Sequence, residues 1–500
     1  MAHDTVLKTV SPESVGIPSE AITAFVRRVK EWKLREHSLI VLRHGDICAE
    51  GYAPVSGEDK LHRMYSVSKT FVTAGIGRLI FEGKLHLDDK VVSFFPDKIK
   101  GPIPEELAET TVRHLLMMAT PHTDGTYTWS PDCTNWTNDF FTAPCTHVPG
   151  TIFRYDTSGT YVLSVLVERL SGKPIMEYLK STIFAKAGFS KDAWCVKAPE
   201  GNSWCGSGVM CTSRDLAKLA IIFKDGGRWN GEQVLPEDFV REATSCMIDN
   251  NFKGRAENCV EGYGYGYFVW RTWRGSYSFW GMGDQFAVTV PDKDIILIAT
   301  ADNQGSPCAA PNLFEAFWDC VVDRATDGPL PENSEALAEM QREIGYLPLP
   351  IIDGDAHSLV ENEIDGRVFR ATRPNEMGIT EFSFRFFGDV GEFHYTNARG
   401  AKVIRFGLGK YEDGTLEESY SGARIHEPCD HEYKTTACAV FVEPHKLVLR
   451  CDVVDWYFGN LTATFGFKGD ACGFRMVKNA EDFMRDYFGW GEGRAEGVNV

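Results

Sequence analysis

Long apolar runs are missing from this 500-residue sequence. A helix needs about 20 consecutive apolar residues to span a bilayer, and no stretch of the chain approaches that length. Residues 1–20 also lack a basic start, an apolar segment and a small-residue cleavage site, which together make a secretory signal. We therefore expect neither membrane insertion nor secretion, and we predict a cytoplasmic protein.

Positive charge is scarce as well. Lys and Arg total 52 against 70 Asp and Glu, so the formal net charge is -18, and no local basic patch compensates for it. A surface of this sign repels phosphate backbones and anionic lipids. We expect no nucleic acid and no membrane as partners, and a small molecule or short peptide as substrate. The sequence leaves open whether the chain forms a homo-oligomer.

Several recognisable patterns are absent. The 14 cysteines include no C-x-x-C pair, which favours buried free thiols over a disulfide framework. There is no heptad run, no long repeat and no G-x-S-x-G elbow, so an α/β-hydrolase triad is not supported. His426, Cys429 and His431 have metal-like spacing but no clear fourth ligand, so a solvated turn is the preferred interpretation. We predict no metal and no organic cofactor.

The length and the pattern of the chain predict two domains, because single cores stop growing near about 250–300 residues. Up to about residue 325, strands such as 38–42 alternate with helices such as 161–170. A Pro-rich stretch with a short helix at 335–344 then suggests a linker over 328–355. We therefore predict a first domain over 1–327 and a second over 356–500.

The second domain shows short segments at strand spacing, separated by turn residues. This pattern predicts an all-β barrel or sandwich. The expected strands are 382–387, 402–406, 439–442, 447–451, 461–467 and 473–477, with turns at 388–389, 413–414 and 469–470.

One S-x-x-K motif carries the first candidate chemistry. Ser66 precedes an apolar helical stripe, and Lys69 follows three residues later, so both side chains face the same way. A serine hydroxyl becomes a good nucleophile when a neighbouring base, such as a partly desolvated lysine, takes its proton. The helix N-terminus would stabilise the resulting negative charge. The alternative is that Ser66 merely caps the helix and that Lys69 is an exposed helix lysine.

The surroundings of this motif resemble a known family. The segments GKLHLDDKVVSFFP, FRYDTSGTYVLSVLVERLSG, GSGVMCTSRDLAKLA and WGMGDQFAVTVPDKDIILIAT follow one another in the order found in serine beta-lactamase and penicillin-binding-protein-like hydrolases. This group includes class C beta-lactamases, D-aminopeptidases and family VIII esterases. The resemblance covers about the first 325 residues. It implies an α+β fold, with an antiparallel sheet flanked by helices, an inserted helical lobe and an active site between them.

The resemblance also implies roles for individual residues. Ser66 would be the nucleophile, and Lys69 would carry its proton. Tyr155 stands where the family has the tyrosine of a Y-x-N motif, and a phenol near two cationic groups can ionise below its usual pKa of about 10. Thr157 replaces the asparagine that holds a substrate amide in lactam-acting members. This replacement argues against beta-lactam and D-Ala-D-Ala substrates.

A third element of the resemblance is the strand that faces the site. It reads YSFWGMGDQ, without the Lys or His of lactam-acting members. We favour Phe279, Trp280 and Gly281 as the family's triad, with the Met282 and Ser66 N–H groups as the oxyanion hole. The register shifted by one residue, 280–282, stays open. The nearby segment 263–270 is expected to be an aromatic strand, because its glycines lack the spacing of a nucleotide-binding loop.

The second domain resembles the lipocalin-like barrels that follow some D-aminopeptidase and esterase-like members, on the strength of GRVFRA, the short strands and AEDFMRDYFGW. Such a barrel is expected to narrow the cleft rather than bind its own ligand. The predicted function is a serine hydrolase that forms an acyl-enzyme on a small ester, amide or peptide. The alternatives are a non-catalytic protein that binds a peptide or acyl ligand in the same cleft, and a true beta-lactamase or D-Ala-D-Ala carboxypeptidase.

Overall fold

The computed structural model describes residues 7–99, 101–123, 134–251, 260–418, 431–479 and 487–495. The chain divides into two compact units, the first ending at Leu349 and the second beginning at Pro350. Across the described residues, no helix combines the length and the hydrophobicity that a membrane span requires.

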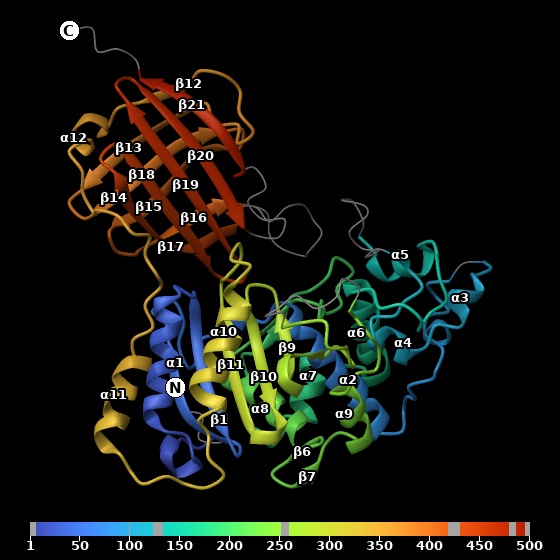
Figure 1. Cartoon of the computed structure of the whole chain (residues 1–500). Coiled ribbons are helices and arrows are strands. Elements are labelled where there is room, and N and C mark those ends of the chain that lie inside the picture. Colours follow the sequence, from blue (N-terminus) through green and yellow to red (C-terminus); the bar gives the residue numbers. More distant parts are fainter. Residues whose placement is uncertain are drawn as a thin grey trace. The chain divides into compact units, whose positions relative to one another are not determined.

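An antiparallel six-stranded sheet forms the centre of the first unit (Figure 1). Its strand order is β2-β1-β11-β10-β9-β8. The strands are β1 (Glu36–Arg43), β2 (Asp46–Tyr52), β8 (Trp270–Arg271), β9 (Tyr277–Gly281), β10 (Gln285–Val290) and β11 (Ile295–Ala301). Every residue of β1, β10 and β11 is buried, because helices cover both faces of the sheet. The strand predicted at 38–42 is the centre of β1.

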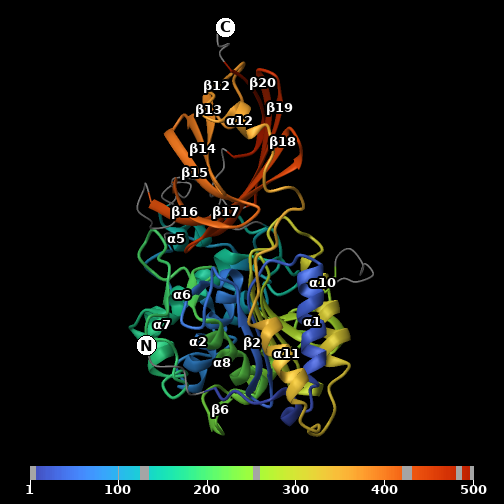
Figure 2. The same cartoon turned by 90° about the vertical axis from the view of Figure 1, so that its left-hand side faces the viewer.

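Helices form a layer on each side of this sheet, as Figure 2 shows. One layer contains α1 (Ser19–Glu31), α10 (Ala309–Phe317) and α11 (Ser334–Ile344), and the other contains α2 (Ser68–Phe81) and α8 (Ser213–Lys224). Phe286 of β10 packs on Phe314 of α10 at 5.4 Å between ring centroids. Phe279 of β9 packs on Phe223 of α8 at 5.2 Å. Phe286 pairs with Trp280, the residue next to Phe279 on β9. The two phenylalanine side chains therefore point to opposite faces of the sheet, as the pleat requires.

A helical lobe follows α2 in the sequence. The helix α6 (Thr157–Ser171) packs against α2 and three shorter helices of the lobe. It begins at the cap residue Asp156 and ends at Gly172, whose φ of 69° places it in the left-handed region that terminates helices. The shorter helices of the lobe are α3 (Glu105–Ala108), α4 (Val112–Leu116), α5 (Trp136–Thr142), α7 (Ile175–Ser181) and α9 (Glu237–Ala243). The sheet, its helical layers and this lobe confirm the predicted fold class.

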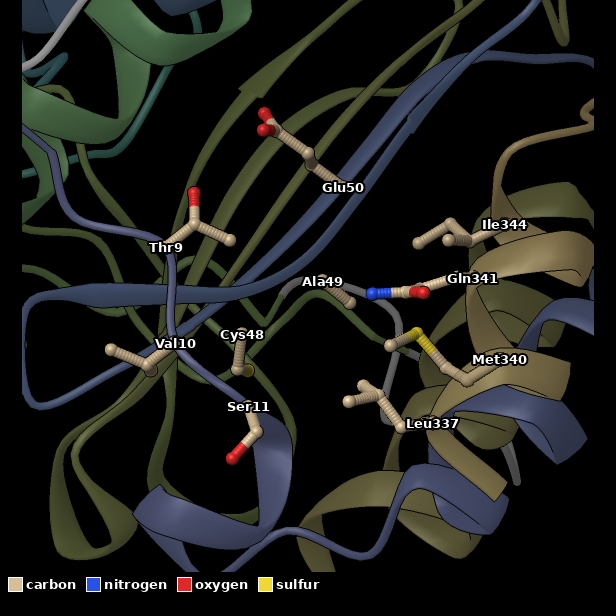
Figure 3. A pocket seen from close by; sticks show the side chains of 10 residues that line it. All are labelled: Thr9, Val10, Ser11, Cys48, Ala49, Glu50, Leu337, Met340, Gln341 and Ile344. Carbon is tan, nitrogen blue, oxygen red and sulfur yellow. The ribbon is translucent and has the colours of Figure 1, made fainter. Parts of the chain in front are cut away.

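The helix expected in the linker belongs to the first unit. Its side chains Met340 and Ile344 are buried, and Glu343 accepts a hydrogen bond from Lys30 Nζ of α1 at 2.8 Å. Figure 3 shows α11 opposite β2, with a pocket of about 380 Å³ between them. The first unit therefore extends beyond residue 327, because the apolar face of α11 needs a partner.

The second unit is a closed β-barrel. Nine strands pair in the order β15-β14-β13-β12-β21-β20-β19-β18-β17, and a parallel pairing of β15 with β17 closes the ring. A further strand, β16, pairs with β17. The strands are β12 (Phe369–Ala371), β13 (Glu381–Phe387), β14 (Val390–Asn397), β15 (Gly400–Leu408), β16 (Glu412–Glu418), β17 (His431–Glu443), β18 (Lys446–Val454), β19 (Phe458–Lys468), β20 (Ala471–Asn479) and β21 (Gly489–Ala495).

Phenylalanine rings occupy the barrel core, where Phe384 lies 4.9 Å from Phe465 and 5.2 Å from Phe393 between ring centroids. The predicted turn at 413–414 is wrong, because Asp413 pairs with Thr436 inside β16. The ladder to β17 overrides the local preference of Asp and Gly for turns.

Candidate active site

A strained turn presents Ser66. The short 3₁₀ helix Tyr65–Val67 runs directly into α2. Tyr65 has a φ of 46°, and a non-glycine residue in this left-handed region costs about 1–3 kcal/mol. The Arg63 guanidinium lies 4.4 Å from the Tyr65 ring centroid, and its Nε donates to the Ser207 carbonyl oxygen at 3.0 Å. These contacts hold the turn in place and leave Ser66 partly exposed.

Lys69 lies beside the serine, as its spacing predicts. Its ammonium nitrogen donates to Ser66 Oγ at 3.0 Å and to the Gly206 carbonyl oxygen at 2.7 Å. The side chain is only 1% exposed. The alternative of an exposed helix lysine is therefore wrong. Ser66 is not the cap residue of α2 either, since the helix has Val67 at that position without a side-chain cap.

Tyr155 completes a cluster with these two residues. It precedes α6, its hydroxyl is hydrogen-bonded with Ser66, and its ring centroid lies 4.9 Å from Lys69 Nζ. Burial raises the pKa of the Tyr155 phenol, and the hydrogen bond with Ser66 opposes that rise only in part. The expected lowering of this pKa is thus wrong, because the ring stacks on Trp270 in an apolar setting. The phenol is neutral at physiological pH.

An aromatic wall extends from Tyr155 to β9. Trp270 stacks on Tyr155 at 5.6 Å and contacts Trp280 at 5.6 Å between ring centroids. The strand predicted over 263–270 is reduced to β8, which contains only its last residue. Left-handed φ values of 105° at Gly264 and 56° at Phe268 interrupt an extended strand there. The segment instead folds Tyr265 back onto Trp270.

Thr157 occupies the first turn of α6, next to the carbonyl that anchors Lys69. A Cβ atom built on Gly206 would lie 2.5 Å from Thr157 Cγ2. The threonine methyl group therefore packs against the Gly206 backbone. Neither Gly206 nor Arg63 was identified from the sequence, although both lie in segments that carry the family resemblance, GSGVMC and RMYSVSK.

Gly281, at the end of β9, approaches the backbone of the turn that carries Ser66. A Cβ atom on Gly281 would lie 2.5 Å from the Met64 carbonyl oxygen and 3.2 Å from Ser66 N. Phe279 is fully buried, and Trp280 is half-buried on the opposite face of the strand. This geometry favours the register in which Gly281 ends the triad. Met282 then begins the turn to β10, where its carbonyl accepts a hydrogen bond from the Gln285 side chain at 3.0 Å.

We expect Gly281→Ala to lower kcat/KM by about a hundredfold, because a displacement of about 1 Å at a catalytic group can have that effect. The added methyl group would push the Met64 carbonyl, which accepts the Val67 N–H at 3.0 Å and so shapes the serine turn. Steady-state kinetics of the variant measures this effect.

Gly57→Ala is the matched control, since the nearest atom to its added methyl group would be Lys60 Cβ at 4.0 Å. Equal turnover in the two variants would show that β9 does not set the geometry of Ser66.

The residues with metal-like spacing cannot be placed in this site. His426 and Cys429 lie outside the described residues, and so does the side chain of His431. The cysteines within the described ranges are free thiols, most of them buried.

Known proteins resemble this chain in sequence and in structure. The family model described as Beta-lactamase matches residues 23–314. A 6-aminohexanoate-dimer hydrolase of Paenarthrobacter ureafaciens is 26% identical over 235 residues, which cover 43% of this chain and 60% of that relative. The esterase EstB of Burkholderia gladioli is 25% identical over 226 residues, covering 38% of this chain and 56% of the esterase. The chain thus spans a little over half of each of these two relatives.

Among solved structures, a putative 6-aminohexanoate-dimer hydrolase from Bacillus anthracis is similar to this chain with a TM-score of 0.49 and 17% identity. The similar region covers 63% of this chain and 86% of that protein.

Proposed function

Because the chain belongs to the beta-lactamase family, we propose that it is a serine hydrolase that forms an acyl-enzyme on Ser66 and cleaves a small ester, amide or short peptide. The family match confirms the resemblance inferred from the sequence, and the named relatives are hydrolases and esterases. One observation carries the finer proposal. A buried lysine, Lys69, contacts the hydroxyl of a partly exposed serine at 3.0 Å.

Acylation would begin with attack of Ser66 Oγ on the substrate carbonyl carbon. In its neutral form, Lys69 takes the hydroxyl proton, which makes the serine oxygen an effective nucleophile. The carbonyl oxygen becomes negatively charged and accepts hydrogen bonds from the backbone N–H groups of Ser66 and Met282. Donors that are already in place stabilise this charge without reorganisation.

Tyr155 would complete the proton transfer. Its raised pKa keeps the phenol protonated, so it is suited to donate a proton to the leaving group rather than to act as the first base. The proton held by Lys69 then restores the phenol. Deacylation uses the same groups: water attacks the carbonyl carbon of the acyl-enzyme while neutral Lys69 takes a proton from it, the bond between that carbon and Ser66 Oγ breaks, and the proton held by Lys69 returns to Ser66 Oγ.

The residues around this cluster favour a neutral acyl or aryl segment directly beside the scissile carbonyl of the substrate. Thr157 lacks the amide that would hold a lactam side chain, and Phe279 and Trp280 offer no cation for a substrate carboxylate. A buried carboxylate or amide without a partner costs several kcal/mol. The aromatic wall of Trp270 and Trp280 instead provides apolar surface.

Covalent labelling tests the proposal. We expect a fluorophosphonate probe to raise the intact mass of the purified protein by one adduct, because an activated serine attacks such phosphorus centres much faster than ordinary side chains do. Prior denaturation should prevent labelling. A native protein that gains no adduct would favour the non-catalytic binding protein.

Substrate preference forms a separate prediction. We expect kcat/KM for short-chain p-nitrophenyl esters to exceed that for nitrocefin by at least about a hundredfold, since the two polar anchors for lactams are missing. Steady-state kinetics on one preparation gives both values. Lactam turnover equal to ester turnover would restore the beta-lactamase or D-Ala-D-Ala carboxypeptidase alternative.

A further inference from the structure

A second pocket lies beside the candidate active site. It has a volume of about 370 Å³ and is lined in part by Trp280, Asp284, Asn303 and Ser306. Trp280 belongs to β9, Asp284 to the turn between β9 and β10, and the other two residues to the loop between β11 and α10. A pocket of this size accommodates a small organic group.

Two structural links connect the residues of this pocket with the serine site. The Asp284 N–H donates to the Gly281 carbonyl at 3.1 Å, and such a turn keeps its first and last Cα atoms within about 7 Å. Gly281 in turn lies against the backbone of Ser66. Trp280 forms part of the pocket wall and also contacts Trp270, which stacks on Tyr155. A molecule bound at Ser66 could therefore extend along this wall into the pocket.

The polar side of the pocket is acidic. The Asp284 carboxylate accepts hydrogen bonds from the side chains of Asn303 and Trp280. Burial raises its pKa to about 7, and nearby Asp302 adds to the rise.

A second carboxyl group lies behind the first. Glu36 is 3% exposed, and its Oε1 accepts a hydrogen bond from Asn303 Nδ2 at 3.1 Å. Its Oε2 is buried without a hydrogen-bond partner. Burial raises the pKa of Glu36 well above its usual value, and the charge of Asp284 raises it further. Asn303 cannot turn to donate elsewhere, because its carbonyl oxygen accepts the Arg35 N–H at 2.8 Å.

We propose that this pocket binds a cationic group of the substrate, an ammonium or an alkylated ammonium, with Asp284 as counter-ion and the Trp280 ring as apolar wall. The inference rests on the proposed function, since it names the substrate class of the same site. A cation favours the ionised carboxylate and is attracted to an indole face, whereas an anion would be repelled by Asp284.

Two matched pairs of substrates test the proposal. Butyrylthiocholine is compared with 3,3-dimethylbutyl thiobutyrate, and p-nitrophenyl 4-(trimethylammonio)butyrate with p-nitrophenyl 5,5-dimethylhexanoate. Each pair exchanges a quaternary nitrogen for carbon of the same shape, on the leaving-group side or on the acyl side. We expect the cationic member of at least one pair to have a kcat/KM about tenfold higher, mainly through a lower KM.

Asp284→Asn keeps the shape of the side chain and removes its charge. We expect it to bring the ratio of cationic to neutral turnover close to one. Asp292→Asn is the matched control, because it removes the same charge from an exposed position beyond the other end of β10 and should leave the ratio unchanged. A ratio near one in the wild-type protein, with neutral substrates hydrolysed, would overturn the proposal, as would a preference that survives in Asp284→Asn.

Calorimetric titration with tetramethylammonium chloride, against sodium chloride at equal ionic strength, does not depend on catalysis. We expect binding to the wild-type protein and none to Asp284→Asn. If no substrate is turned over and no phosphonate adduct forms, the proposed function fails. The titration then tests the proposed cation site by itself. Absence of tetramethylammonium binding to the folded wild-type protein overturns the site, and binding that requires Asp284 supports it.

Discussion

Replacing Ser66 by alanine should abolish ester hydrolysis and fluorophosphonate labelling, while the protein stays folded. Without the hydroxyl group no acyl-enzyme can form, and what remains is stabilisation of the transition state by the backbone donors alone. Removal of a catalytic nucleophile typically lowers kcat by about 10⁶-fold. Intact-mass analysis and steady-state kinetics on the variant measure the two effects.

Ser68 provides the matched control, since it lies two positions further along the same segment. It is fully buried, and its hydroxyl oxygen accepts the Val209 N–H at 3.0 Å. We expect Ser68→Ala to lower the free energy of unfolding by about 1–3 kcal/mol, the cost of leaving a buried donor unpaired. It should still form the phosphonate adduct. An adduct that persists in Ser66→Ala would assign the nucleophile to another residue.

Lys69→Met should lower kcat by about 10²–10⁴-fold, the usual contribution of a general base. Methionine keeps the length and apolar bulk of the side chain, but it can neither accept the Ser66 proton nor donate to the Gly206 carbonyl. Single-turnover acylation by a p-nitrophenyl ester, followed at saturating enzyme, isolates the affected step.

A second buried helix lysine separates this chemical role from a structural one. Lys218 of α8 is 1% exposed, and its Nζ donates to the Gly188 carbonyl at 2.7 Å, much as Lys69 donates to Gly206. Lys218→Met should therefore lower the melting temperature without lowering kcat once folded. If both variants lose stability and neither loses kcat, Lys69 has no part in the reaction.

The fold class of the first domain followed from the family resemblance, whereas the proximity of Ser66 and Lys69 followed from local order in the sequence. Ser66 and Lys69 lie on one helical turn, so their spacing alone predicts that they meet. Tyr155 came from the resemblance, and the pKa expected for it was wrong. That pKa rises because the phenol is buried, and residues distant in the sequence, such as Trp270, contribute to the packing around it, which no local pattern reveals.

The acidic pocket could not be predicted from the sequence for the same reason. Glu36 stands on β1, Asp284 in the turn after β9 and Asn303 beyond β11, and only the pairing of the sheet brings the three together. In the barrel, β14 was not among the strands named from the sequence, although Phe393 and Tyr395 alternate with more polar residues in the two-residue period of a half-buried strand. Its pairing with β13 and β15 establishes it as a barrel strand.

The packing of α11 also protects the first unit against self-association. Strand β2 is the last of the central sheet, and an exposed edge strand offers unpaired N–H and C=O groups to any similar strand. Part of that edge is satisfied by the preceding segment, since the Val10 N–H donates to the Ile47 carbonyl at 2.9 Å and the Ile47 N–H donates to the Lys8 carbonyl at 2.8 Å. The end of α11 covers Gly51 of this strand, so closely that a Cβ atom on Gly51 would lie 2.0 Å from the Ile344 carbonyl oxygen. A first unit cut at residue 327 would lose this cover and expose an edge strand that can pair with other chains, whereas one that ends at Leu349 keeps α11 against the strand and should aggregate less.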